Sequence, residues 1–206
     1  MSPGATMMRV YDALKARITA GGFGPGERLD PHQLAMDLAA SPTPVREALH
    51  RLAGERLVES WQQEGFRQPH IVEPAIRDLY DWSSELVHVV LRSAARPTTI
   101  AVAATSAVAA DYVARVEGAF TDLALRSSNH EHRLAIASLN DRMALCRRAE
   151  ALVLPRSDED VSPIDSALAD ARWTDAARAF DHFHRRRLRI VGEIAGILRS
   201  HKHIGP

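Results

Sequence analysis

The chain contains 206 residues, which suits one large or two small domains, and either arrangement could bury a hydrophobic core. Hydrophobic residues make up 46% of it and charged residues 25%, as in ordinary soluble globular proteins, while an aromatic share of only 5% and abundant Ala, Leu and Arg favour helices. Basic and acidic residues are equal in number and neither half has a clear basic excess. Composition alone therefore gives no indication of nucleic-acid binding.

Cysteine usage and the apolar stretches indicate the cellular compartment. The single cysteine, Cys146, excludes an intrachain disulfide and indicates a reducing compartment, so we expect a cytoplasmic protein. The start of the sequence lacks a basic region followed by an apolar core, so we expect no secretory signal. The longest weakly apolar stretch, residues 98–113, is short and interrupted by Asp111. It predicts a core helix and no membrane span.

Two helices are expected at the beginning of the chain. Residues 9–20 carry apolar side chains at helical spacing, and the glycine-rich residues 21–26 predict a turn. A short second helix should begin at Asp30, because Asp is a good cap, Pro31 suits the first helical position and Gln33 follows three residues after the cap. The residues expected to face the core are Val10, Ala13, Leu14, Ile18, Leu34, Ala35 and Leu38.

A third helix is expected to begin at two prolines. With Ser41 or Thr43 as the N-cap, Pro42 and Pro44 fall in the first turn, where backbone N–H groups have no intrahelical partner. The prolines therefore open this helix and do not break it. An apolar stripe follows at Val45, Ala48, Leu49 and Leu52, and the opposite side carries Arg46, Glu47, His50 and Arg51.

A β-hairpin and then a purely helical half complete the expected fold. Residues 57–61 and 66–72 alternate in polarity and are separated by the polar turn 62–65. A helix should then run from Pro74 to a residue before Pro97, and helical patterns recur at 98–126, 129–154, 163–171 and 173–200. The fold class predicted is mainly α, with a winged helix-turn-helix domain at 1–73 and an all-helical bundle at 74–206.

The order of three helices and a hairpin places one helix where it could enter a DNA major groove, with the hairpin reaching the backbone or minor groove. Arg46 lies near the N-terminal end of that helix and could make a bidentate contact to guanine, worth about 1–3 kcal/mol of discrimination. The amides of the helix start and Thr43 could hold a phosphate.

The segment VYDALKARITAGGFGPGERLDPHQLAMDLAASPTPVREALHRLAGERLVE resembles the GntR family of bacterial transcription regulators. The landmarks are PGERL (25–29), TPVREAL (43–49), RLA (51–53) and LVE (57–59), and the resemblance covers roughly the first third of the chain. It implies a homodimer that binds paired half-sites of double-stranded DNA, usually as a repressor that responds to a small metabolite.

The resemblance also implies roles for single residues. Arg46 matches the family's guanine reader, Arg51 its second helix arginine, Thr43 its phosphate-binding threonine and Gly65 the glycine at the wing tip. The full candidate DNA-binding set is Ser41, Thr43, Arg46, His50, Arg51, Gly65 and Arg67. Where the family commonly has Ser-Arg-Thr-Pro, this chain has Pro42 in place of the arginine. Arg56 stands where the family commonly has glycine.

The helical half resembles the FCD branch of the family, to which FadR-type regulators belong. The resemblance rests on IRDLYDWSSELVHVVLRSA (76–94), AIASLND (135–141) and AARAFDHFH (176–184). It implies a helical bundle around an effector pocket, often with a divalent metal bound by an Asp, a His four residues later and two further histidines. That pattern is incomplete here, because Ser127 or Ser128 replaces the Asp and no histidine lies near Ser162.

Three readings of the helical half remain open. A metal site would use His132, His184 and Glu131. A metal-free site for an organic anion would use Arg92, Arg133, His132 and His184. The third reading is a pocket that has lost its ligand.

A helical metal-dependent enzyme or an assembly protein, with a vestigial winged domain, is the alternative to a regulator. Because the chain lacks a Glu-x-x-His pair, a nucleophile motif and a phosphate loop, we expect no enzyme.

Overall fold

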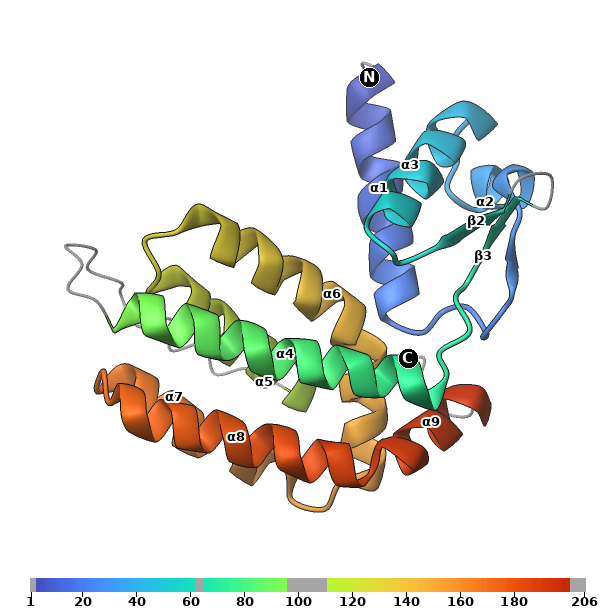
Figure 1. Ribbon diagram of the computed structural model, residues 1–206. Helices are drawn as coiled ribbons and strands as arrows, with labels where there is room; N and C mark the ends of the chain where they lie inside the picture. Colours follow the sequence, from blue (N-terminus) through green and yellow to red (C-terminus); the bar gives the residue numbers. More distant parts are fainter. Residues whose placement is uncertain (1–2, 62–64, 96–110, 201–206) are drawn as a thin grey trace. The chain divides into compact units, whose positions relative to one another are not determined.

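The computed structural model describes residues 3–61, 65–95 and 111–200 (Figure 1). Within these ranges the fold is mainly α, as the sequence predicts, and it contains nine α-helices, one short 3-10 helix and a small three-stranded sheet. The chain divides into two compact units, one formed by Met1–Ile71 with the final residues from Ile197 grouped with it, the other by Val72–Gly196. Of the helices in the described ranges, none combines the length and apolar character needed to cross a bilayer.

The first unit is built on three helices: α1 (Pro3–Thr19), α2 (Pro31–Asp37) and α3 (Pro42–Gly54). Helix α1 begins earlier than the expected residue 9. Helix α3 packs against both α1 and α2, because the apolar stripes of all three converge on one core. The expected stripe of α3 is confirmed, since its four residues are fully buried, while Leu38 at the end of α2 is half-buried at the edge of the core.

The sheet of the first unit has one strand more than the sequence predicts. Strands β2 (Glu59–Trp61) and β3 (Gly65–Arg67) form the expected antiparallel hairpin, but β3 ends well before residue 72. Strand β1 (Arg28–Leu29) pairs with the other side of β3, which gives the order β1-β3-β2. Two residues are too few to show a periodic pattern, and for this reason sequence analysis missed β1.

Gly26 explains why a glycine precedes β1. Its φ is +72°, and a Cβ placed there would lie 2.1 Å from Nε2 of His70. The Gly26 amide donates to the carbonyl of Gln68 at 2.9 Å, and the Gln68 amide donates to the carbonyl of Glu27 at 2.9 Å. The left-handed backbone conformation thus requires glycine, and a larger residue would also have to displace the exposed His70 side chain.

Helices α2 and α3 differ in how their N-termini are capped. At α2, the Asp30 carboxylate accepts from the amides of His32 and Gln33 at 2.7 and 3.2 Å, so the predicted cap is confirmed. At α3, Ser41 occupies the N-cap position but its side chain makes no capping hydrogen bond, and Pro42 begins the helix. The prolines thus stand in the first turn, as expected, and fix the start of α3 without a side-chain cap.

The second unit contains the rest of the helices: α4 (Glu73–Ala94), α5 (Tyr112–Leu125), α6 (His130–Val153), the 3-10 helix η1 (Ser157–Asp160), α7 (Ser162–Ala169), α8 (Trp173–Arg189) and α9 (Val191–Ser200), whose last residues are grouped with the first unit. Helix α4 packs against α5, α6 and α8, and it runs beside α8 in Figure 1. The single helix expected over 173–200 is interrupted at Ile190. Most of the helix expected at 98–113 lies outside the described residues.

Candidate DNA-binding surface and the polar centre of the helical unit

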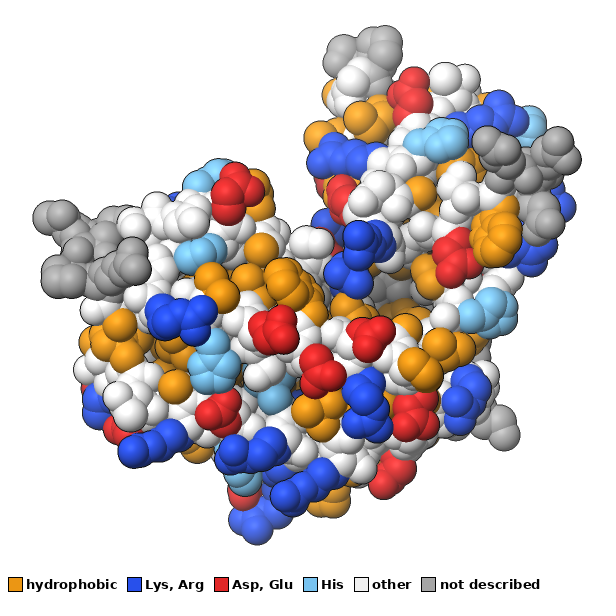
Figure 2. All heavy atoms as spheres, in the orientation of Figure 1, with side chains coloured by type: hydrophobic (Ala, Val, Ile, Leu, Met, Phe, Trp, Pro, Cys, Tyr) orange, Lys and Arg blue, Asp and Glu red, His pale blue; other side chains and the backbone are white. Residues whose placement is uncertain are grey.

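The exposed face of α3 carries the side chains that the sequence singles out. Thr43, Arg46, Glu47 and His50 are exposed there, because the apolar stripe turns the opposite face of the helix toward the core. Charges of both signs are interspersed on the face of this unit seen in Figure 2, and they form no continuous basic patch.

Arg46 is held at the junction of the two helices. Its Nη2 lies 3.2 Å from Nε2 of His32, the second residue of α2, and both side chains are exposed. The neutral imidazole can accept a hydrogen bond from the guanidinium, which leaves the remaining N–H donors of Arg46 pointing to solvent. Sequence analysis missed His32, and its only signal was its position just after the cap of α2.

Arg51 faces a different neighbour from Arg46. Its guanidinium carbon lies 4.0 Å from the ring centroid of Tyr11 on α1, and its Nε donates to Glu55 at 3.3 Å. The Tyr11 hydroxyl also donates to Glu55, which pairs with Lys15 at 3.3 Å. Arg51 is thus already engaged in contacts that join α1 to α3.

His50 and the wing residues complete the candidate set. The ring of His50 packs edge-on against Phe66 of β3, with centroids 4.8 Å apart, which joins α3 to the hairpin. Gly65 begins β3 with φ +83°, a conformation that suits glycine, and Arg67 reaches the carbonyl of Gly26 at 3.4 Å. Of the expected turn 62–65, only Gly65 lies within the described residues.

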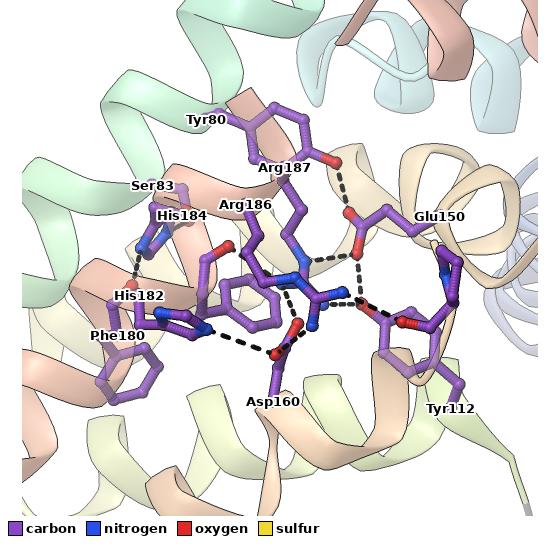
Figure 3. A network of polar contacts seen from close by, with 12 residues as sticks. Tyr80, Ser83, Tyr112, Glu150, Asp160, Phe180, His182, His184, Arg186 and Arg187 are labelled. Atoms are coloured by element: carbon purple, nitrogen blue, oxygen red, sulfur yellow. Dashed lines mark hydrogen bonds and ion pairs between the residues drawn. The ribbon is translucent and has the colours of Figure 1, made fainter. Parts of the chain in front are cut away.

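The second unit has a polar centre that sequence analysis did not anticipate (Figure 3). The side chains of Glu150 on α6 and Arg187 on α8 are completely buried and form an ion pair, with Nε of Arg187 2.8 Å from Oε2 of Glu150. The same arginine pairs through Nη1 with the buried Asp160 of η1 at 2.9 Å. Arg187 also donates to the hydroxyl of Tyr112 on α5 at 2.6 Å.

Two tyrosine hydroxyls complete this network. The hydroxyls of Tyr80 on α4 and Tyr112 donate to the two carboxylate oxygens of Glu150. Burial, and then the negative charge of Glu150, raise the pKa of both phenols, so they remain donors. Burial alone would lower the pKa of Arg187, but the charge of Glu150 raises it above its ordinary value. We call Tyr80, Tyr112, Glu150, Asp160 and Arg187 the polar cluster.

His184 lies in the same unit as a neutral, hydrogen-bonded residue. Its Nδ1 lies 2.8 Å from the carbonyl of Phe180, which can only accept, so Nδ1 carries the proton. Nε2 then accepts from the hydroxyl of Ser83 at 2.9 Å. Burial is the main cause that lowers the pKa of His184 to about 4.

The proposed metal ligands do not form a metal site. His132 bonds through Nδ1 to Ser127 at 2.8 Å, Glu131 is exposed, and both ring nitrogens of His184 are already used. Across residues 3–61, 65–95 and 111–200, no three His, Cys, Asp or Glu side chains are grouped so that they could hold a metal ion. Within the described residues His132, His184 and Glu131 are thus not grouped as metal ligands, and the two histidines bond to serines, His132 to Ser127 and His184 to Ser83 on α4.

Arg92 and Arg133, the two arginines proposed for an organic-anion site, take no part in the hydrogen bonds and ion pairs described above for the polar cluster. Arg92 is exposed at the end of α4, and Arg133 is half-buried on α6 with its Nε buried and without a hydrogen-bond partner in the described part of the chain. A further arginine, Arg147, was missed. It is 1% exposed and donates to Asn140 at 2.9 Å, while its buried Nη1 lies 3.8 Å from Glu117 and has no hydrogen-bond partner among the described residues.

The residues missed in the second unit gave little signal in the sequence. Glu and Arg are residue types that usually lie on a solvated surface, and nothing in the spacing of Glu150 and Arg187 shows that they meet across two helices. The only available indication was that each falls in register with the buried stripe of its own helix.

Three helices, of which the third packs against the first two, followed by an antiparallel hairpin, define the first unit as a winged helix-turn-helix domain. Residues 6–67 match the family model described as "Bacterial regulatory proteins, gntR family". The winged unit thus matches the GntR family model over nearly its whole length, in agreement with the resemblance seen in the sequence.

Curated relatives of the chain are named as regulators. The chain is 37% identical over 76 residues to the HTH-type transcriptional repressor GlaR of Escherichia coli K12, a match that covers 37% of this chain and 34% of that protein. It is 28% identical over 167 residues to the Nta operon transcriptional regulator of Aminobacter aminovorans, over 75% of this chain and 80% of that protein. The chain thus spans about a third of the length of the first curated relatives it matches. The names agree with the expectation that the chain is no enzyme.

A solved structure extends the likeness to the second unit. The fold is similar to that of a putative transcriptional regulator GntR from Rhodococcus sp. RHA1, with a TM-score of 0.68, 17% identity and coverage of 91% of this chain and 98% of the other. At this identity the likeness concerns the fold, which pairs a winged domain with a helical one in a single chain.

Proposed function

We propose that the protein is a cytoplasmic homodimeric transcription regulator of the GntR type, which binds double-stranded operator DNA through α3. The observation that carries this proposal is Arg46, exposed on α3 and held by His32 within a winged unit that matches the GntR family. Regulators and a repressor among the relatives support the same reading, and we propose repression as the mode of action.

The proposed division of labour on α3 follows from the contacts of each side chain. Arg46 reads a guanine, because its donors remain available, while Thr43 and the first amides of α3 hold a phosphate. Arg51 contacts the DNA backbone and no base, since Tyr11 and Glu55 already hold its guanidinium. Ser41, His50, Gly65 and Arg67 lie at the helix start and the wing, and we propose that they support contacts to the sugar-phosphate backbone.

A salt-dependent gel shift on the DNA upstream of the gene tests the proposal, with Arg46→Ala and Arg51→Ala beside the wild type. The wild type should bind specifically with a steep dependence on salt. Arg46→Ala should lose roughly 5- to 150-fold in preference for the operator over random DNA, which corresponds to about 1–3 kcal/mol. Arg51→Ala also removes one positive charge from α3, but it should weaken binding to the operator and to random DNA equally. Absence of specific binding at low salt would overturn the proposal.

We also propose that the second unit is an FCD-like domain that supplies the dimer interface and binds a small organic acid. The buried Arg147 favours an anionic ligand, because its Nη1 has no hydrogen-bond partner in the described part of the chain and its ion pair with Glu117 is long, at 3.8 Å. Burial lowers the pKa of Arg147, so a further negative charge nearby would stabilise its charged form. Arg92, Arg133, His132 and His184 remain the contacts proposed from the sequence. Binding would shift the equilibrium between DNA-binding and released states of the dimer.

Thermal-shift measurements with a panel of mono- and dicarboxylic acids test the effector class. An acid that raises the Tm of the wild type but not of Arg147→Met supports the proposal. Arg178→Ala is the matched control, because the Arg178 side chain on α8 is 77% exposed and its removal should leave the response unchanged. Cationic and neutral metabolites are measured beside the acids, and if only they raise the Tm, the organic-acid class is excluded.

A further inference from the structure

The geometry of the polar cluster resembles that around a bound cation, with a side chain in the cation's place. The guanidinium of Arg187 lies between the carboxylates of Glu150 and Asp160, at 2.8 and 2.9 Å, and within 2.6 Å of the Tyr112 hydroxyl. Its Nη1 also donates to the carbonyl of Phe183 at 2.9 Å. Oxygen atoms from several elements thus surround one buried positive group (Figure 3).

The oxygens of the cluster are already occupied. Glu150 accepts from Tyr80 through one oxygen and from Tyr112 and Arg187 through the other. Asp160 accepts from Arg187 through Oδ2 and from Arg186, at 2.5 Å, through Oδ1. A metal ion could bind these carboxylates only by displacing a guanidinium.

The cluster joins elements that are far apart in the sequence. Tyr80 comes from α4, Tyr112 from α5, Glu150 from α6, Asp160 from η1 and Arg187 from α8. Bonds to a single guanidinium thus connect four of these elements, and Glu150 connects the fifth. A structural metal ion acts in the same way, since it holds ligands from separate segments at one point.

We propose that Arg187 serves as a built-in cation of the helical unit, bridging Glu150 and Asp160 in place of a metal ion, so that this unit folds and works without a divalent metal. The proposal goes beyond regulation of DNA binding and does not depend on it. The histidines give it further support, because His184 and His132 are bonded to serines and no group of three possible metal ligands occurs in the described ranges.

The first test uses the wild-type protein. Purified protein should contain no stoichiometric Zn, Mn, Ni or Fe by elemental analysis, and extended dialysis against EDTA should leave its Tm unchanged. Stoichiometric metal whose removal lowers the Tm would overturn the proposal, because the cluster would then not be sufficient. This test does not require any variant to fold.

The second test replaces the cation itself. Arg187→Ala should lower the Tm by roughly 10 °C, because the buried Glu150 loses its ion-pair partner and Asp160 keeps Arg186 but loses Arg187. Methylguanidinium at millimolar concentration should then raise the Tm of this variant by roughly 3 °C or more, since it can enter the space left by the side chain. Arg187→Lys should be intermediate, because an ammonium group cannot reproduce the forked geometry of guanidinium.

Arg178→Ala is the matched control, since it removes an exposed arginine from the same helix. It should keep the wild-type Tm and show no response to methylguanidinium. If Arg187→Ala retains the wild-type Tm, or if methylguanidinium raises the Tm of both variants equally, the guanidinium is not the cation that holds this unit together.

Discussion

At the scale of single residues, two arginines on one helix have contacts that divide their roles. Arg46 is exposed and bonds to His32, whereas Arg51 lies over Tyr11 and pairs with Glu55. The sequence assigns both to DNA, because both stand on the polar side of α3. The tertiary contacts leave Arg46 as the side chain with donors free to reach a base.

The contact with His32 leads to a prediction at the same scale. His32→Ala should weaken specific operator binding about fivefold, because Arg46 loses the hydrogen bond that orients it, worth about 1 kcal/mol. Fluorescence anisotropy on operator and random DNA measures the effect. Equal affinity of His32→Ala and wild type for the operator would show that His32 does not position Arg46.

His184 predicts how stability depends on pH. Its pKa is lowered to about 4 in the folded protein from 6.5, so the unfolded chain binds the additional proton between these values. Stability contributed by neutral His184 is therefore present above pH 6.5 and is lost as the pH falls toward 4, by at most about 1.4 kcal/mol per pH unit.

Urea unfolding at pH 7, 6 and 5 measures this dependence. His184→Gln should flatten the decrease in unfolding free energy, although it lowers stability at pH 7. A decrease of the same steepness in wild type and His184→Gln would assign the pH dependence to other groups.

At the scale of elements, helix ends are set by residues in unusual backbone conformations. Ala39 after α2 has φ +48° and Arg56 after α3 has φ +61°, the left-handed region that favours glycine. At α3 the amide of Leu57 donates to the carbonyl of Leu52 at 3.0 Å, which closes the helix end. The glycine common in the family at position 56 is thus explained, because the backbone there is left-handed.

A substitution just after α2 tests this account. Ala39→Gly should raise the free energy of unfolding by about 1 kcal/mol, since glycine removes the steric cost of the left-handed conformation. The same substitution at Ala35, which is buried within α2, should lower it by about 1 kcal/mol or more. Urea denaturation compares the two variants, and destabilisation by both would refute the assignment of strain to Ala39.

At the scale of the whole molecule, one chain joins a winged unit to a helical unit, and we propose that two chains act together. A twofold dimer places two α3 helices on half-sites about one DNA turn apart. Inserting about 5 bp between the half-sites should reduce affinity roughly tenfold or more, while inserting about 10 bp should restore much of it, because the half-sites return to the same face of the duplex. Gel shifts with spaced operators measure this, and indifference to spacing would exclude a rigid dimer.

Much of the winged unit could be predicted from the sequence because its signals are local. The cap at Asp30, the prolines that open α3 and the apolar stripe from Val45 depend on neighbouring residues, and the structure confirms them. The two-residue strand β1 could not be predicted, since its pairing with β3 depends on residues distant in the chain. The interruption of the last helix at Ile190 was also missed, because the apolar pattern continues across it.

By itself the sequence determined the order of the helices, the position of α3 and the family of the winged unit, since each depends on short-range periodicity, capping and an ordered motif. Only the tertiary structure decided the contents of the helical unit. Glu150, Asp160 and Arg187 come from three separate elements, and their burial as a paired cluster depends on how those elements pack. Burial of a charge is tolerated where an opposite charge compensates it. Because the sequence does not show which residue will be the partner, a charged residue in a helical pattern is expected at the surface.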